Sequence, residues 1–209
     1  MYHTEQEHFW AGEFGNLYVE RNQGEQMLAS NLTLFSQALR HIEPIADMIE
    51  FGANRGMNLQ ALQLLMPSTK QNAIEINDTA VVELQKIIPL EHIFHQSILA
   101  WSSPQQWDLT LIKGVLIHIN PDELANVYQK LVGSCKKYLL LVEYYNPSPM
   151  MVSYRGHSER LYKRDFAGEI MASYPQMKLI NYGFMYKGDK NFPQDDLTYF
   201  LLEKTPSTQ

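Results

Sequence analysis

The hydrophobic pattern of this chain alternates between continuous apolar runs and runs with helical spacing. Strands are predicted at residues 46–51, 72–76, 92–97, 107–113 and 137–145, and the last of these is a continuous apolar run, typical of a strand buried on both faces of a sheet. Apolar residues recur every three or four positions, as in helices, at 25–42, 55–66, 78–88, 120–135 and 164–174. Two further strands are predicted at 177–186 and 197–204. This alternation predicts an α/β fold with a doubly wound, mostly parallel sheet that ends in a C-terminal antiparallel hairpin.

Prolines and polar capping residues set the expected ends of these helices. Pro44 and Pro67 follow the first two, because proline cannot continue a helix. Asp78 is the expected N-cap of the third helix. Asn120 is expected to cap the fourth, with Pro121 as its first residue. The segment after the strand at 137–145 is expected to be a polar loop.

Composition excludes several classes of protein. The chain has 209 residues, 45% of them hydrophobic and 19% charged, which fits a single globular domain. Its formal net charge of -6 argues against nucleic-acid binding, which depends on clustered Lys and Arg. Cys135 is the only cysteine, so no internal disulfide can form, as expected in the cytoplasm. No apolar stretch approaches the roughly 20 residues of a membrane span, so we expect none.

The segment MIEFGANRG, residues 48–56, ends the first predicted strand with an acid, two glycines and an asparagine. It lacks the third glycine of the dinucleotide fingerprint G-x-G-x-x-G. The pattern instead resembles motif I of the class I methyltransferases that use S-adenosylmethionine. Asn54 can replace a glycine because asparagine tolerates positive φ. The resemblance implies that Gly52 and Gly56 pass the cofactor's methionine part and that Glu50 orients it; the alternative is a plain tight turn.

The ends of the next strands supply the other candidate cofactor residues. Glu75 ends the second strand, where folds that bind adenosine place a carboxylate for both ribose hydroxyls. In the methyltransferase fold, Ser97 would accept from the adenine amine and Ile98 would lie on the ring, although an acid is usual at the position of Ser97. Lys113 and Gly114 follow the fourth strand and would lie beside the methionine part.

Methyl transfer to a hydroxyl or amine needs a group that takes the acceptor's proton. Glu143 is the first choice, because a carboxylate at the end of so apolar a strand is partly desolvated. His118 and Tyr144 are the other candidates. His118 has a second interpretation, as a histidine buried in the core.

The N-terminal segment FWAGEFGNLYVERN concentrates aromatic residues ahead of the first predicted helix. It is expected to fold over the open end of the sheet as a lid, in which Trp10, Phe14 and Tyr18 exclude water. Trp10 and Tyr18 are therefore candidate substrate-binding residues. A plug on the sheet edge and a partner-binding arm are the alternatives.

The loop after the fifth strand carries the one pronounced basic cluster, which consists of Arg155, His157, Arg160, Lys163 and Arg164. Guanidinium groups bind carboxylates and phosphates in bidentate geometry. An anionic small-molecule acceptor is therefore expected here, with Arg155, His157 and Arg160 as substrate-binding residues. The alternative is a solvated loop whose charges pair with Asp165 and Glu169.

Several blocks, namely HFWAGEFGNLYVERN, EFGANRGMNL, VLIHINPDEL, EYYNPSPMMVSYRGHSERLYKRDFAGE and DLTYFLLEK, extend over nearly the whole chain. Together they resemble the pseudaminic acid biosynthesis-associated methylases. The resemblance implies a Rossmann-like fold of the class I methyltransferase type, S-adenosyl-L-methionine as cofactor and a nonulosonic-acid sugar, free or activated, as acceptor. Within the single domain, it implies a cap and helix at 1–43, a cofactor-binding core at 44–145 and an acceptor side at 146–209.

Other functions stay open at this stage. A methyltransferase acting on a protein such as flagellin would use a similar open polar groove. A non-catalytic module would bind the cofactor and transfer nothing, and a nucleotide-dependent oxidoreductase would need the missing glycine. The seven histidines show no metal-ligand spacing, so no metal is expected.

Overall fold

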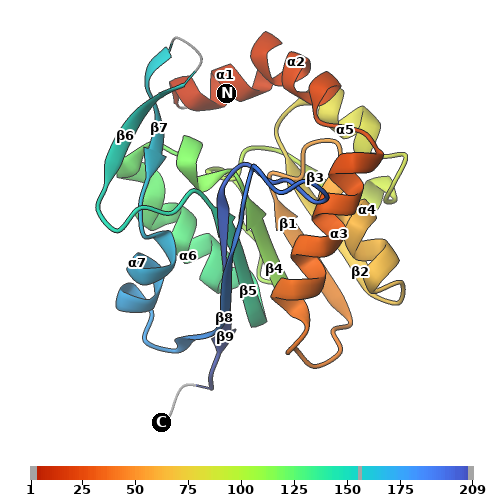
Figure 1. Cartoon of the computed structure of the whole chain (residues 1–209), viewed down its shortest axis with the longest axis vertical. Helices are drawn as coiled ribbons and strands as arrows, with labels where there is room; N and C mark the ends of the chain where they lie inside the picture. Colours follow the sequence, from red (N-terminus) through yellow and green to blue (C-terminus); the bar gives the residue numbers. More distant parts are fainter. Residues whose placement is uncertain (1–3, 155–156, 207–209) are drawn as a thin grey trace.

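The computed structural model describes the backbone of residues 4–154 and 157–206, with side chains for 4–151 and 161–206. Its main feature is a seven-stranded sheet in the order β3-β2-β1-β4-β5-β9-β8 (Figure 1). The strands are β1 Asp47–Phe51, β2 Lys70–Glu75, β3 Ile93–His95, β4 Trp107–Lys113, β5 Cys135–Glu143, β8 Met177–Met185 and β9 Leu197–Lys204. The first five are parallel, and β9 runs antiparallel to both β5 and β8. The predicted doubly wound sheet with its C-terminal antiparallel pair is confirmed.

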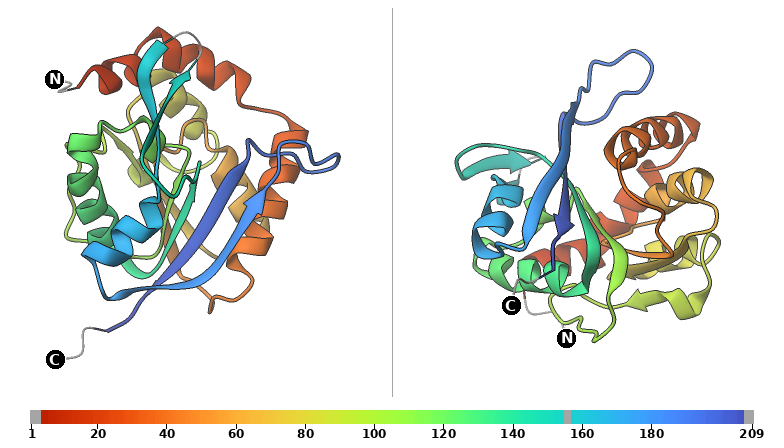
Figure 2. Two further views of the ribbon diagram at one scale, coloured as in Figure 1. Left: turned by 60° about the vertical axis from the view of Figure 1, so that its left-hand side comes forward. Right: turned by 90° about the horizontal axis from the view of Figure 1, so that it is seen from below.

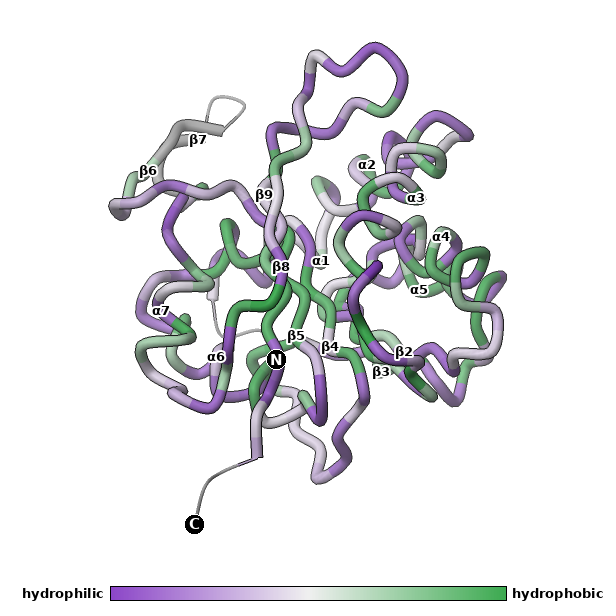
Figure 3. The backbone as a smooth tube through the Cα atoms, turned by 60° about the horizontal axis from the view of Figure 1, so that its bottom comes forward, coloured by the Kyte–Doolittle hydropathy of each residue, from purple (hydrophilic) through white to green (hydrophobic). Residues whose placement is uncertain are grey.

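Helices cover both faces of the sheet, as Figure 2 shows. They are α3 Glu25–Leu39, α4 Met57–Leu65, α5 Asp78–Leu84, α6 Leu124–Ser134 and α7 Phe166–Ser173. Alternate residues of the strands face the two layers. Leu109 and Leu140 join the core under α3, α4 and α5, whereas Ile112 and Leu139 join the core under α6 and α7. In Figure 3 the central strands β4 and β5 are largely hydrophobic, while the connection between β8 and β9 is largely hydrophilic.

Three local predictions need correction. The N-cap of α5 is Asn77, whose side chain accepts from the backbone of Ala80, so Asp78 is the first helical residue instead. The segment Pro121–Glu123, with Asn120 as cap, is a 3-10 turn that precedes α6. The expected polar loop after β5 contains a hairpin of β6 Met150–Tyr154 and β7 His157–Lys163. The polarity of this segment does not report the hairpin, because strands pair through their backbone groups.

Two short helices precede α3 and lie across one end of the sheet (Figure 1). These are α1 Glu5–Ala11 and α2 Glu13–Arg21. Thr4 and Glu7 start α1 with a reciprocal capping box, in which each side chain accepts from the other residue's backbone N–H. We refer to α1 and α2 as the N-terminal cap. Within the described residues, no helix is long and apolar enough to cross a membrane.

Candidate functional site

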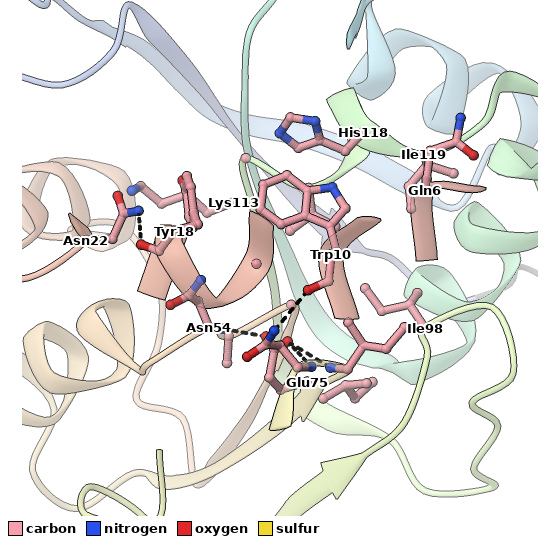
Figure 4. Close-up of a pocket in the computed structure, with 18 of the residues that line it drawn as sticks. Gln6, Trp10, Tyr18, Asn22, Asn54, Glu75, Ile98, Lys113, His118 and Ile119 are labelled. Carbon is pink, nitrogen blue, oxygen red and sulfur yellow. Dashed lines mark hydrogen bonds between the residues drawn. The ribbon is translucent and has the colours of Figure 1, made fainter. Parts of the chain in front are cut away.

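A cavity of about 460 Å³ lies between the carboxyl ends of the parallel strands and the N-terminal cap (Figure 4). Seven of the nine residues predicted to bind a cofactor line it: Gly52, Asn54, Glu75, Ser97, Ile98, Lys113 and Gly114. The other two, Glu50 and Gly56, lie behind the wall. Gly56 has a left-handed backbone and starts α4. A Cβ there would lie 2.6 Å from Ile87 Cδ1, so this glycine permits close packing of α4.

The turn after β1 has the backbone conformation that its residues suggest. Gly52 has φ of 77° and Asn54 has φ of 49°, both in the left-handed region. A Cβ at Gly52 would lie 2.7 Å from Cγ2 of Val115, in the loop after β4. Glycine at this position therefore brings the loops after β1 and β4 together at the cavity.

Glu75 ends β2 and points into the cavity beside Asn54 (Figure 4). Its carboxylate accepts from three backbone N–H groups, those of Asn54 at 2.7 Å and of Ile76 and Asn77 at 2.8 Å each. Burial raises the pKa of Glu75, and these three hydrogen bonds oppose the rise. The carboxylate is thus oriented by the backbone and ties the β1 turn to the end of β2.

Glu50 is fully buried at the end of β1. Oε1 accepts from Asn58 Nδ2 at 2.6 Å, while Oε2 has no hydrogen-bond partner among the described residues. Burial raises the pKa of Glu50 to about 8, partly opposed by the Asn58 hydrogen bond and the Lys113 charge. Asn58 lines the cavity, so any influence of Glu50 on a ligand passes through Asn58 or Lys113.

Lys113 ends β4 and lines the same wall. Burial lowers the pKa of its ammonium, and Glu50, Asp195 and Glu143 oppose the change. Lys113 is thus a buried cation at the cavity wall, with carboxyl groups around it that favour its charged form. We call Gly52, Asn54, Glu75, Lys113 and Gly114 the strand-end wall.

Glu143, the first-choice base, does not line the cavity. Its Oε1 accepts from the backbone N–H groups of Val115 at 2.8 Å and Leu116 at 2.9 Å. Burial raises the pKa of Glu143 to about 7, while the backbone hydrogen bonds of Leu116 and Val115 oppose the rise. The position of Glu143 fits a residue that holds the loop carrying Gly114 and His118.

His118 and Tyr144, the other candidate bases, do line the cavity, together with Trp10 and Tyr18 of the cap. The Trp10 indole packs against the imidazole of His118, with ring centroids 4.6 Å apart, and against Tyr18 at 5.1 Å. Tyr144 Oη donates to Asp195 at 3.4 Å. Figure 4 shows Trp10 between His118 and Glu75. We call Trp10, His118, Tyr144 and Gln194 the side-chain wall.

The cap is fastened to residues that neighbour the strand-end wall. Asn77 Nδ2 donates to the backbone oxygen of Trp10 at 3.1 Å and to Asn16 Oδ1 at 2.9 Å. Arg55 donates to the backbone oxygen of Val19 at 3.1 Å. The segment expected to form a lid is thus a pair of helices that borders the cavity at the open end of the sheet.

Part of the predicted basic cluster is not described. Arg155 lies outside the described residues, and His157 and Arg160 belong to β7 without described side chains. Arg164 pairs with Glu169 at 2.7 Å, as in the solvated-loop alternative. Among the described residues, no group of three His, Cys, Asp or Glu could hold a metal ion.

Sequence reasoning did not single out three polar residues of the cavity, namely Glu7, Asn58 and Asn77. Thr4-x-x-Glu7 is a capping-box pattern and could have revealed α1. Asn58 lies two residues after Gly56 at the start of a helix. No local pattern reports the contact between Glu7 and Ser97, which are 90 residues apart.

Several solved methyltransferase structures have the same architecture. The mitomycin 7-O-methyltransferase MmcR aligns with 97% of this chain at a TM-score of 0.63 and 12% identity. The alignment covers 61% of MmcR, so this chain spans about three fifths of that protein's length. The fold is that of the class I methyltransferases. No protein-family model and no curated protein sequence matches the chain.

Two further neighbours contain the demethylated cofactor. The 1,6-didemethyltoxoflavin-N1-methyltransferase of Burkholderia thailandensis, solved with didemethyltoxoflavin and S-adenosylhomocysteine, has a TM-score of 0.68, 11% identity and coverage of 96% of this chain and 87% of that one. The plantazolicin methyltransferase BpumL with S-adenosylhomocysteine has a TM-score of 0.62, 12% identity and coverage of 96% and 94%. These comparisons do not support the resemblance to the pseudaminic acid methylases.

Proposed function

We propose that this protein is an S-adenosylmethionine-dependent methyltransferase that acts on a small-molecule acceptor. The main observation in support is the position of the Glu75 carboxylate on the cavity wall, beside the left-handed turn after β1. Three backbone N–H groups hold this carboxylate in place. A vicinal diol is the ligand group that a carboxylate binds through both oxygens. The fold shared with three methyltransferases supports the same activity.

The residues present fit this cofactor. A cavity of about 460 Å³ is within the range of small-molecule sites. Gly114 lines it with φ of 65°, and a Cβ added there would meet no atom within 4 Å, so the backbone borders open space. Glu75 would hold the ribose, and Lys113 the carboxylate of the methionine part. When bound, the sulfonium group supplies the methyl group and its leaving group.

The chain's own residues would align the acceptor and remove its proton. His118 and Tyr144 are the proposed proton acceptors, because both line the cavity, whereas Glu143 would position the loop that carries His118. Trp10 and Tyr18 would exclude water from the reacting atoms. This assignment replaces the order of preference that the sequence suggested.

The acceptor's identity is a narrower proposal. An anionic, nonulosonic-acid-like sugar is supported by the basic residues that the sequence gathers between 155 and 164. A protein substrate such as flagellin is the competing possibility. The neighbours act on different kinds of molecule, since MmcR is a 7-O-methyltransferase and the Burkholderia enzyme is an N1-methyltransferase. The fold therefore does not select the acceptor.

Calorimetric titration with S-adenosylmethionine, S-adenosylhomocysteine and NAD tests the proposal. We expect micromolar binding of the two sulfur nucleotides and none of NAD. Glu75→Ala should weaken binding by about 1 to 3 kcal/mol, roughly 5- to 150-fold. Glu91→Ala, which removes an exposed carboxylate outside the cavity, is the matched control and should bind normally. Failure of the wild-type protein to bind either sulfur nucleotide would refute the proposal.

A further inference from the structure

Glu7 is a buried carboxylate on the cavity wall that comes from outside the sheet. It belongs to α1 of the N-terminal cap, and 7% of its surface is exposed. It lines the cavity beside the segment Gln96–Leu99 that follows β3. Burying a carboxylate costs free energy of folding unless hydrogen-bond donors surround it. The donors around Glu7 therefore bear on its role.

Donors from two parts of the chain orient this carboxylate. Oε1 accepts from the Ser97 hydroxyl, and Ser97 Oγ in turn accepts from the backbone N–H of Leu99 at 3.1 Å. Oε2 accepts from Thr4 through its backbone N–H at 2.8 Å and its hydroxyl at 3.2 Å. Glu7 is thereby fixed against the loop after β3. A carboxylate accepts from several donors at once, so one that is held at the cavity wall can accept from a ligand donor too.

The order of the strands determines which part of a bound nucleoside would lie at this end of the cavity. Gly52 and Gly114 follow β1 and β4, Glu75 ends β2, and Ser97 follows β3 at the edge of the parallel strands. A nucleoside whose ribose lies at Glu75, with its sulfur-bearing chain toward β1 and β4, must direct its base toward β3. Ile98 lies there beside Glu75 and offers an apolar surface for the ring (Figure 4).

The ring nitrogens N1, N3 and N7 of adenine are acceptors, and its exocyclic amine is the donor that a carboxylate can accept from. We infer that Glu7 accepts a hydrogen bond from the exocyclic amine of the cofactor's adenine. The N-terminal cap would thereby take part in recognising the base. This inference rests on the proposed function. It makes Glu7 a determinant of preference for aminopurine over oxopurine ligands.

The test compares S-adenosylhomocysteine with S-inosylhomocysteine, which carries a carbonyl oxygen where adenine carries the amine. Wild-type protein should prefer the adenine compound at least about tenfold, because a carboxylate facing a carbonyl lacks its donor. Glu7→Gln supplies an amide that can donate to that carbonyl. The preference of this variant should fall to within about threefold or reverse.

Thr4→Ala is the control for the structural role of Glu7. It removes the hydroxyl of the capping box and leaves the carboxylate in place. A loosened α1 would weaken both ligands together, so the affinity ratio of this variant should equal that of the wild type. Because the ratio is measured on one protein, partial loss of cap structure in Glu7→Gln cannot imitate the expected result.

The outcomes separate the inference from the proposed function. Equal binding of both compounds to the wild type, or an unchanged preference in Glu7→Gln, overturns the role of Glu7 and leaves the cofactor assignment standing. Absence of binding of both compounds to the wild type overturns the cofactor assignment, and the inference with it.

Discussion

The strand-end wall of the cavity is ordered by backbone groups, whereas the side-chain wall is ordered by side chains from distant parts of the chain. On the strand-end wall, Glu75 accepts three backbone hydrogen bonds and Glu143 braces the adjoining loop with two. On the side-chain wall, the Trp10 and His118 rings pack together, and Tyr144 donates a long hydrogen bond to Asp195.

The difference indicates a division of labour. Backbone hydrogen bonds to buried carboxylates fix a geometry that few substitutions of neighbouring side chains can alter, which suits an invariant ligand such as a cofactor. A wall of side chains can change its shape through substitution while the sheet remains the same. If the proposed function holds, the acceptor is therefore expected to be selected on the side-chain wall.

The largest expected effect concerns the pH dependence of stability, through the buried carboxyl behind the strand-end wall. The pKa of Glu50 in the folded protein is about 8, instead of 4.5. Between these values the folded protein binds more protons than the unfolded chain, so the free energy of unfolding falls as pH rises. The stabilising contribution is complete below about 4.5 and is lost through about 8.

Glu50→Gln should remove this slope. Urea denaturation should show the variant more stable than the wild type by about 4 kcal/mol at pH 8, with the difference shrinking toward pH 5. Glu91→Gln, at an exposed carboxylate, should follow the wild-type curve. If Glu50→Gln and wild type lose stability in parallel as pH rises, burial does not raise the pKa of Glu50.

The strand-end wall is also the part that sequence predicts well. Turn chemistry and strand ends are local properties, and both place Gly52, Asn54 and Glu75 correctly at the carboxyl edge of the sheet. For Glu143 the sequence could not show a nonlocal feature, namely that backbone N–H groups of the loop after β4 donate to its carboxylate. Glu7 was overlooked because its helix docks on a strand end that lies far along the sequence.

The next largest effect concerns the cap, which joins the two walls. Asn77→Asp keeps an oxygen to cap α5 but replaces the amide donor that faces Trp10 and Asn16. The new carboxylate then faces the backbone oxygen of Trp10 without a donor between them, so the cap should loosen. Affinity for S-adenosylhomocysteine should fall by about tenfold, and trypsin should cleave after Arg21 faster, because each lost hydrogen bond costs about 1 kcal/mol.

Asn181→Asp is the matched control for this variant. Asn181 Nδ2 donates at 2.9 Å to two backbone oxygens, those of Gln37 and Ala38, away from the cavity. The same chemical change there should lower stability and leave ligand affinity unchanged. If Asn77→Asp and wild type bind S-adenosylhomocysteine with equal affinity, the cap contributes nothing to the cofactor site. The cap would then not connect the two walls.

The smallest expected effect on cofactor affinity comes from substitutions in the side-chain wall, and it tests the division between the walls most directly. His118→Asn and Tyr144→Phe alter the side-chain wall alone, so calorimetry should give dissociation constants for S-adenosylhomocysteine within about twofold of wild type, in contrast to Glu75→Ala. With an acceptor in hand, loss of the proton acceptor should lower kcat by about 100-fold or more. A tenfold loss of cofactor affinity in either variant would show that cofactor binding also depends on the side-chain wall. Other residues would then have to select the acceptor, and the basic residues of β7 would be the first to test.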